Sequence, residues 1–346
     1  MANLRFCFII IMENLNQLKN LLSTPKDIVI FSHRNPDGDA LGSSLGLAHF
    51  LSAQHHSVKI ILPSEYPNYL NWMVGVEDIV IYDLVPEHAK LVIEKADIFF
   101  CLDFNSLDRI DKCGDLMMKQ KAPKVVIDHH LFPENFADFI LSDTTASSTS
   151  ELIFDFIHLL DQSKYLVPAT ADALYVGIVS DTGSFLYNTS SKVFRITATL
   201  LDRGVDDVSI QNRLHNNLEI KQLKIIGHCL NKRFEILEEY ATALVTITKE
   251  DYAEFDIQRG DTEGIVNMLM RIQNIKVAVL ITEQPTIVKL SMRSKGDFSV
   301  QEIATKHFKG GGHKNASGAA SFIGLKSTVR KFKELLPLYA EQLSQN

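Results

Sequence analysis

Cysteine is scarce in this 346-residue chain, and its four cysteines form no C-x-x-C pair. They are spread along the sequence, at Cys7, Cys101, Cys113 and Cys229. This pattern argues against a disulfide framework and against a zinc–thiolate site, and it fits a reducing compartment. We therefore expect a cytoplasmic protein.

A terminal apolar run long enough to span a bilayer is also missing. The apolar segment at residues 6–12 is too short, and no small-residue cleavage site precedes Glu13. We expect neither a signal peptide nor a membrane partner. Two points about this segment stay open: translation starts at Met1 or at Met12, and the apolar run could support contact between two copies in a homodimer.

The chain has no excess of basic residues. It contains 35 Lys and Arg against 42 Asp and Glu, which gives a net charge of −7. A broad basic face for a long duplex nucleic acid is therefore not expected. A small anion held in a local basic pocket is compatible with this balance. The hydrophobic fraction of 46% suffices for more than one core, and the length suggests two domains.

Short β-branched runs alternate with helical patterns in the first half of the chain. Leu41, Leu45, Ala48 and His49 recur at helical spacing between the first two runs. We predict strands at residues 28–32, 58–62, 79–82, 98–102, 124–127 and 139–141. This alternation is typical of an α/β fold with a parallel sheet covered on both faces. Ligands of such sheets gather outside the carboxyl ends of the strands.

The second half of the chain has a different order of elements. A helical stretch near 171–180 closes the first half, and strands are predicted at 241–248, 276–282 and 286–293. A glycine-rich loop and a last amphipathic helix at 327–343 follow. We predict a first domain at 12–206, a helical linker at 207–235 and a smaller α/β domain at 236–346, with a cleft between the two domains.

Carboxylates and histidines follow the predicted elements at one end of the first sheet. They are His33, Asp37 and Asp39, then Asp103, then Asp128, His129 and His130, and finally Asp181. Each cluster alone has a structural explanation: Asn-Pro-Asp-Gly is a good β-turn, and a lone histidine is more often structural than a ligand. Together, so many carboxylates would raise one another's pKa, and bound cations would remove that conflict. Oxygen and nitrogen donors without thiolate favour manganese or a similar divalent ion.

These motifs resemble the DHH phosphoesterase superfamily. The resemblance rests on H-x-N-P-D-G-D-A-L-G-S at 33–43, the single Asp103, Asp-His-His at 128–130 and G-I-V-S-D-T-G at 177–183. The run G-G-G-H-K-N-A-S-G at 310–318 resembles the DHH-associated domain. The matches follow the family's order over nearly the whole chain. The chain's size is similar to that of the nanoRNase/oligoribonuclease branch, which also acts on 3′-phosphoadenosine 5′-phosphate.

The resemblance implies a site with two divalent metal ions, expected to be Mn²⁺. One ion would be bound by His33, Asp37 and Asp103, and the other by Asp39, Asp103, His129 and Asp181. Asp128 would orient an imidazole ring from outside the ligand set. His130 would contact the substrate phosphate or protonate the leaving oxygen.

The second domain is expected to hold the substrate. The resemblance places Arg293 at the substrate, where a guanidinium can grip a phosphate with two hydrogen bonds. The glycine run would let backbone N–H groups approach a phosphate or a base. The substrate-binding residues that we predict are Arg293, Ser294, Gly311, Gly312 and His313.

The implied activity is hydrolysis of very short oligoribonucleotides to nucleoside monophosphates, of 3′-phosphoadenosine 5′-phosphate to AMP, or of both. Short single-stranded RNA or small nucleotides would be the partners. Three alternatives stay open: a hydrolase of linear or cyclic dinucleotides, a non-catalytic nucleotide-binding regulator, and a metalloprotein whose ions are structural. An inorganic pyrophosphatase would share the motifs of the first domain but not the run at 310–318.

Overall fold

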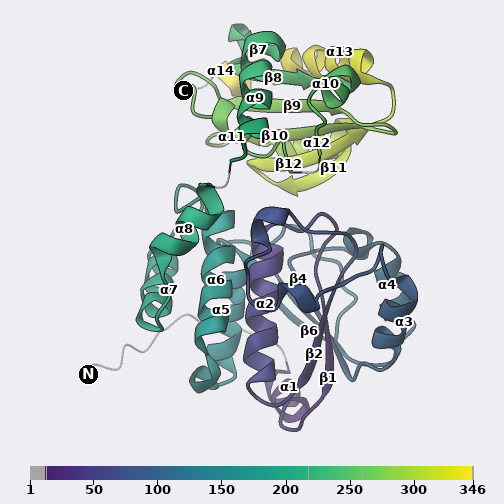
Figure 1. Ribbon diagram of the computed structural model, residues 1–346, viewed down its shortest axis with the longest axis vertical. Helices are drawn as coiled ribbons and strands as arrows, with labels where there is room; N and C mark the ends of the chain where they lie inside the picture. The colour runs from purple at the N-terminus through teal and green to yellow at the C-terminus, as the bar shows by residue number, and fades with distance from the viewer. Residues whose placement is uncertain (1–11, 13, 217, 259, 345–346) are drawn as a thin grey trace. The chain divides into compact units, whose positions relative to one another are not determined.

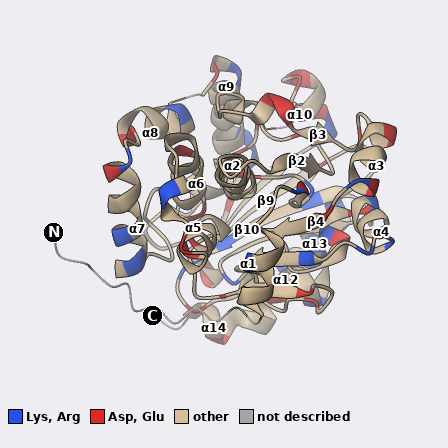
Figure 2. Ribbon diagram, turned by 90° about the horizontal axis from the view of Figure 1, so that it is seen from below, with Lys and Arg blue, Asp and Glu red and all other residues tan. Residues whose placement is uncertain are grey.

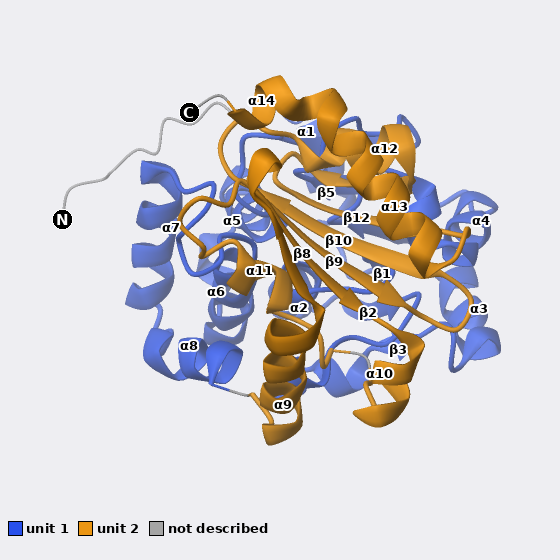
Figure 3. Cartoon of the chain, turned by 90° about the horizontal axis from the view of Figure 1, so that it is seen from above, with its two compact units in different colours: residues 1–217 blue, residues 218–346 orange. Residues whose placement is uncertain are grey.

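The structure, a computed structural model, describes residues 12, 14–216, 218–258 and 260–344. The chain divides into two compact units, residues 1–217 and 218–346 (Figure 3). This division falls inside the predicted linker, so that α8 (Asp207–His215) belongs to the first unit and α9 (Ile220–His228) to the second. The apolar run at 6–12 lies outside the described residues, except for Met12, which is buried.

The first unit is built on a six-stranded parallel sheet with the strand order β3-β2-β1-β4-β5-β6. The strands are β1 (Asp27–Phe31), β2 (Ser57–Leu62), β3 (Val80–Ile81), β4 (Ile98–Leu102), β5 (Lys124–Asp128) and β6 (Phe139–Ser142). All six were predicted from the sequence. β4 and β5 are buried along their whole length, as strands covered on both faces must be.

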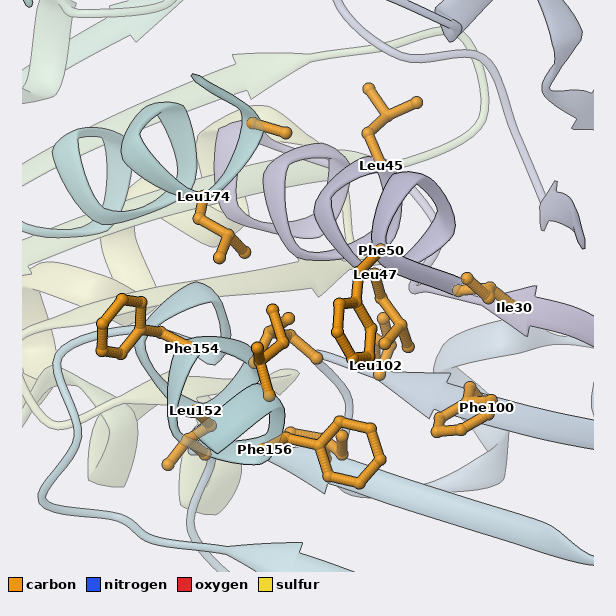
Figure 4. Packing of buried hydrophobic residues seen from close by; sticks show 14 of the residues in the cluster. Ile30, Leu45, Leu47, Phe50, Phe100, Leu102, Leu152, Phe154, Phe156 and Leu174 are labelled. Carbon is orange, nitrogen blue, oxygen red and sulfur yellow. The ribbon is translucent and has the colours of Figure 1, made fainter. Parts of the chain in front are cut away.

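Helices cover both faces of this sheet (Figure 1). One face carries α2 (Gly38–Ser52), α5 (Thr149–Leu159) and α6 (Pro168–Asp181), with α7 (Ser191–Asp202) packed on them; α1 (Leu15–Leu21) adds Leu18 to the same core. The other face carries α3 (Pro86–Glu94) and α4 (Lys112–Met118). Phe50, Phe100, Phe156 and Leu174 join the first core from α2, the sheet, α5 and α6 (Figure 4).

The strand order reverses between β1 and β4, which are neighbours in the middle of the sheet. The chain moves outward from β1 to β2 and β3, then returns to β4 and continues to β5 and β6 on the other side. Such a reversal opens a crevice at the carboxyl ends of the two central strands, and ligands of open α/β sheets bind there. Those ends lead directly into His33 and Asp103.

The second unit has a mixed sheet with the strand order β11-β12-β10-β9-β8-β7, in which the β8–β9 pair is parallel and the other described pairs are antiparallel. Its strands are β7 (Phe234–Leu237), β8 (Thr242–Ile247), β9 (Val277–Glu283), β10 (Val288–Ser294), β11 (Lys309–His313) and β12 (Ala316–Ser321). Its helices, besides α9, are α10 (Lys249–Glu254), α11 (Ile265–Leu269), α12 (Val300–His307), α13 (Leu325–Leu335) and α14 (Ala340–Ser344). α12, α13 and α14 pack on one face, and α9, α10 and α11 on the other.

Two predictions about the second unit were wrong. The glycine-rich segment is not a loop, because residues 309–313 form β11, which pairs with β12. A β-carbon added at Gly310 would lie 2.6 Å from the Cα of Ala319, so glycine allows this close pairing. The last helix is not continuous either. A tight 3₁₀ turn (Leu336–Tyr339) separates α13 from α14, and it contains Pro337, which has no backbone N–H to donate.

Basic and acidic residues are interspersed over the helices of both units (Figure 2). Among the described residues, no helix combines the length and the apolar character that crossing a bilayer requires. The predicted boundaries at 206 and 235, the cleft and the homodimer stay predictions.

Candidate functional site

The first group of candidate residues lies where β1 passes into α2. His33 follows the strand by two residues and is 5% exposed. Asp37 is the N-cap of α2, and its Oδ1 accepts hydrogen bonds from the backbone N–H of Asp39 (3.0 Å) and Ala40 (3.1 Å). The Asn-Pro-Asp-Gly segment thus caps α2 through the Asp37 side chain, and it bends at Arg34 and Asn35 instead of forming the β-turn that the motif predicted. It also brings the fully buried Asp39 into the first turn of the helix.

Asp103 comes directly after β4 and has a left-handed backbone, with φ of 64°. Aspartate tolerates this region better than most residues with a side chain, but the conformation is still unfavourable. The side chain is buried, and its two oxygens point toward different histidines. Oδ2 lies 3.3 Å from His33 Nε2, and Oδ1 lies 3.6 Å from His129 Nε2.

The Asp-His-His triplet begins at the last residue of β5. Asp128 is fully buried, and its Oδ1 lies 2.7 Å from His130 Nδ1, so it orients His130. His129 Nδ1 lies 3.2 Å from the carbonyl oxygen of Ala146. The other ring nitrogen of His129, Nε2, lies 3.2 Å from Asp181 Oδ2 at the end of α6.

The structure thus brings all eight predicted residues of the first unit together. The residues include the groups His33–Asp37–Asp103 and Asp39–His129–Asp181, and within each group the ligand atoms all lie within 4.8 Å of one another. The Asp103 carboxylate joins them, because its oxygens lie beside His33 in the first group and His129 in the second.

The segment at 147–151, which includes the first turn of α5, supports this site, and the sequence analysis did not single it out. The backbone N–H groups of Thr149 and Ser150 donate to Asp39 Oδ2 (2.6 Å) and Oδ1 (3.0 Å). The Thr149 hydroxyl donates to Asp103 Oδ1 at 2.9 Å. The run Ser-Ser-Thr-Ser-Glu at 147–151 is a recognisable helix start. Nothing in that signal, however, indicates contact with residues more than 40 positions away.

Glycines bring α2 and α6 close enough for their carboxylates to meet. A β-carbon at Gly42 would lie 2.6 Å from the carbonyl oxygen of Ala173 and 2.8 Å from the Cα of Gly177. A β-carbon at Gly38 would collide with the hydroxyl of Ser180. The two helix backbones therefore touch beside the site. Asp39 comes from α2 and Asp181 from α6.

Burial and the neighbouring charges shift the pKa values of these groups. Burial, with the charges of Asp103 and Asp181, raises the pKa of Asp39 well above its ordinary range. Burial also raises the pKa of Asp181, against its hydrogen bond with His129. Burial opposes ionisation of Asp103 too, but the hydrogen bond with His33 and the neighbouring histidines hold its pKa below its usual range. Asp181, Asp103 and Asp39 in turn raise the pKa of His129 against the effect of burial.

The residues present fit a divalent cation. They offer carboxylate oxygens and imidazole nitrogens without thiolate, a set that suits manganese and similar ions. Their closest contacts, 3.2 to 3.6 Å, are near the roughly 3 Å that separates adjacent ligand atoms of an octahedral ion bound at about 2.1 Å. A cation would also favour the charged form of Asp39, which the protein alone disfavours.

The predicted substrate residues lie in the second unit, on strands β10 and β11, which both pair with β12. Arg293 and His313 both pair with Ala316, so their side chains share one face of the sheet. Gly311 belongs to the same face, through its pairing with Gly318. Leu290 and Met292 point to the opposite face, into the core.

Ser294 differs from the other predicted substrate residues. It is 7% exposed, and its hydroxyl donates to the carbonyl oxygen of Phe298 at 2.7 Å and accepts from the side-chain amide of Asn315 at 2.9 Å. These bonds connect the end of β10 to the segment before α12 and to the turn before β12. Its hydroxyl therefore has a structural role within the second unit.

Comparisons with known proteins agree with these observations. Residues 27–178 match the DHH family, N-terminal domain, and residues 239–342 match the DHHA1 domain. The probable bifunctional oligoribonuclease and PAP phosphatase NrnA of Streptococcus mutans is 30% identical, over 85% of this chain and 89% of its own. The bifunctional oligoribonuclease and PAP phosphatase NrnA of Bacillus subtilis is 27% identical, over 88% and 93%.

A solved structure matches both units. The exopolyphosphatase-related protein of Bacteroides fragilis superposes with a TM-score of 0.91 at 37% identity, covering 96% of this chain and 97% of its own. Given these matches, the chain belongs to the DHH family and carries a DHHA1 domain, as its motifs predicted.

Proposed function

We propose that this protein is a metal-dependent phosphoesterase that hydrolyses very short oligoribonucleotides, 3′-phosphoadenosine 5′-phosphate, or both. The observation that carries the proposal is the position of Asp103. Its two oxygens lie between two sets of ligand atoms, as a carboxylate shared by two ions requires. The activity in the names of the NrnA relatives, which match nearly the whole chain, supports this class of substrate.

The ligand sets that we propose follow the two groups in the structure. His33, Asp37 and Asp103 would hold one ion, and Asp39, Asp103, His129 and Asp181 the other. We propose Mn²⁺ in both positions. When bound, two divalent ions would lower the pKa of a water so that hydroxide is available near neutral pH, and they would offset negative charge on the phosphate.

The surrounding residues would position the reacting groups. Asp128 holds His130 by its Nδ1, which leaves Nε2 as the atom that can meet a substrate oxygen. We propose that His130 Nε2 contacts the phosphate or donates a proton to the leaving oxygen. Thr149 and Ser150 keep Asp39 oriented, so that it does not need to rearrange when the ion binds.

The face of β10 and β11 that carries Arg293, Gly311 and His313 would bind the rest of the substrate. Gly311 and Gly318 leave the strand backbones uncovered by side chains there, and the charge of Arg293 lies on the same face. A strand backbone without side chains can contact a base or a sugar, and the guanidinium of Arg293 can bind a phosphate. We propose Arg293, Gly311, Gly312 and His313 as substrate contacts.

The test compares substrates of different length. Purified protein and Asp103→Asn would be incubated with labelled RNA of two to five nucleotides, with a 24-mer and with 3′-phosphoadenosine 5′-phosphate, in Mn²⁺, Mg²⁺ or EDTA. We expect Mn²⁺-dependent release of mononucleotides from the short RNAs or of AMP from the bisphosphate, slow turnover of the 24-mer, and loss of both activities in the variant.

Other outcomes would change the assignment. Turnover of the bisphosphate alone would make the protein a nucleotide phosphatase, and turnover of linear or cyclic dinucleotides alone would make it a dinucleotide hydrolase. Tight nucleotide binding with Mn²⁺ but no turnover of any substrate would favour a non-catalytic regulator over the enzyme.

A further inference from the structure

A buried ion pair lies directly behind the turn that supports the site. The Oε2 atom of Glu151 accepts hydrogen bonds from the backbone N–H and the hydroxyl of Ser147, both at 2.8 Å. Its other oxygen, Oε1, lies 2.8 Å from the Nζ atom of Lys192. Glu151 is 2% exposed, so its charge is stable only because both oxygens have partners.

Lys192 comes from the first turn of α7, outside every motif that identifies the family in this sequence. Its side chain is 12% exposed, and its Nζ atom also lies 2.5 Å from Asp155 Oδ2. Among the hydrogen bonds of the described residues, none joins Asp155 to the turn at 147–150, whereas Glu151 holds the turn directly. Lys192 therefore has two acidic partners, and only one of them reaches toward the site.

The turn at 147–150 connects Glu151 to the candidate metal ligands. Within four residues of Ser147, Thr149 and Ser150 donate their backbone N–H groups to both oxygens of Asp39, and the Thr149 hydroxyl donates to Asp103. On the other side of Ser147, the carbonyl oxygen of Ala146 lies 3.2 Å from His129 Nδ1. Three candidate ligands thus depend on one turn, and Glu151 fixes that turn from behind.

We propose that Glu151, held by Lys192, is a positioning residue that sets the metal affinity of the site. The inference rests on the proposed function, because it takes Asp39, Asp103 and His129 as metal ligands. With the turn fixed, the ligands are oriented before an ion arrives, and binding does not have to order them. Residues that orient ligands in this way typically change metal affinity by about 10- to 100-fold when they are removed.

Calorimetric titration of the EDTA-stripped full-length protein with Mn²⁺ tests this. We expect Glu151→Ala to weaken Mn²⁺ binding by roughly 10- to 100-fold, with most of kcat restored at saturating Mn²⁺. Glu151→Gln keeps an oxygen that can accept from Ser147, so a much smaller loss is expected. Asp155→Asn is the matched control, because it removes a partner of Lys192 without touching the turn, and it should bind Mn²⁺ like the wild type.

The outcomes separate this inference from the proposed function. Wild-type protein that binds no Mn²⁺ would overturn both. Wild-type affinity in Glu151→Ala, or an equal loss in Asp155→Asn, would overturn the positioning role alone, because the ion pair would then serve only the stability of α5 and α7. If Glu151→Ala does not fold, Glu151→Asp carries the test, since it keeps the charge but is too short to reach both Ser147 and Lys192. It too should weaken Mn²⁺ binding, and unchanged binding would overturn the inference.

Discussion

Gly177 on α6 lies directly against the carboxylate of Asp39 on α2. A β-carbon added at Gly177 would lie 2.6 Å from Asp39 Oδ1 and would collide with the hydroxyl of Ser150. Glycine in the middle of a helix lowers stability by about 0.5–1 kcal/mol relative to alanine. At position 177 the absence of a side chain lets Asp39 on α2 approach Asp181, which lies on α6 with Gly177.

Gly177→Ala should therefore damage the site more than the fold around it. We expect Mn²⁺ affinity and kcat/KM to fall by at least about tenfold, because Asp39 or Ser150 must move away from the new methyl group. The control is Gly227→Ala on α9, where an added β-carbon meets nothing within 4 Å. That variant should be neutral or more stable by up to about 1 kcal/mol. Equal effects of the two changes, measured by calorimetry and thermal unfolding, would contradict the close packing at Gly177.

Asp103→Asn should separate catalysis from folding. Asparagine tolerates the left-handed backbone at φ of 64° about as well as aspartate, so the fold should survive. The loss of a charge shared between two ions should lower kcat by roughly 10³-fold or more, since such ions contribute several kcal/mol. Asp161→Asn is the matched control, because Asp161 also has a positive φ, of 57°, and its side chain is 85% exposed. Substantial activity in Asp103→Asn would remove Asp103 from the site.

Arg293→Met tests the substrate face of the second sheet. If the guanidinium holds a phosphate, its loss should raise KM by about 10- to 100-fold, the value of one or two charge-assisted hydrogen bonds, and change kcat much less. Arg330→Met is the control, because Arg330 is a 73% exposed side chain on α13. Steady-state kinetics with a short RNA would measure both. A fall in kcat with unchanged KM would place Arg293 outside substrate binding.

Asp155 should make stability depend on pH. Burial raises its pKa to about 6, above the ordinary value of 3.8, although Lys192 lies beside it. The folded state therefore holds this proton more tightly than the unfolded state does. The resulting contribution is fully present below about pH 4 and is lost as pH rises through 6, which amounts to at most roughly 3 kcal/mol of the free energy of unfolding. Asp155→Asn should flatten urea-unfolding stability across this range, and an unchanged slope would assign the dependence to other groups.

Much of this architecture could be predicted from the sequence. The six strands of the first sheet appear as apolar β-branched runs, because strands buried on both faces have no polar alternation. The carboxyl ends of parallel strands meet at one edge of a sheet, so the sequence alone predicts that His33, Asp103 and Asp128 lie together. The motifs then gave the family.

What could not be predicted depends on contacts between distant positions. Ser147 to Glu151 looks like any helix start, and only the fold shows that it holds Asp39, 110 positions away. Lys192 sits in an ordinary amphipathic helix, and nothing local indicates its pairing with Glu151. β11 was missed because glycine is unfavourable in strands, and only its close pairing with β12 makes glycine suitable there.

The most direct test of the account is to count the ions. Calorimetric titration of stripped wild-type protein with Mn²⁺ should show two ions per chain, and Asp103→Asn should lose high-affinity binding of at least one. That result would establish a paired-metal site at the carboxyl ends of β1, β4 and β5. A wild-type protein that binds no Mn²⁺, or a variant that still binds two ions with unchanged affinity, would contradict the account.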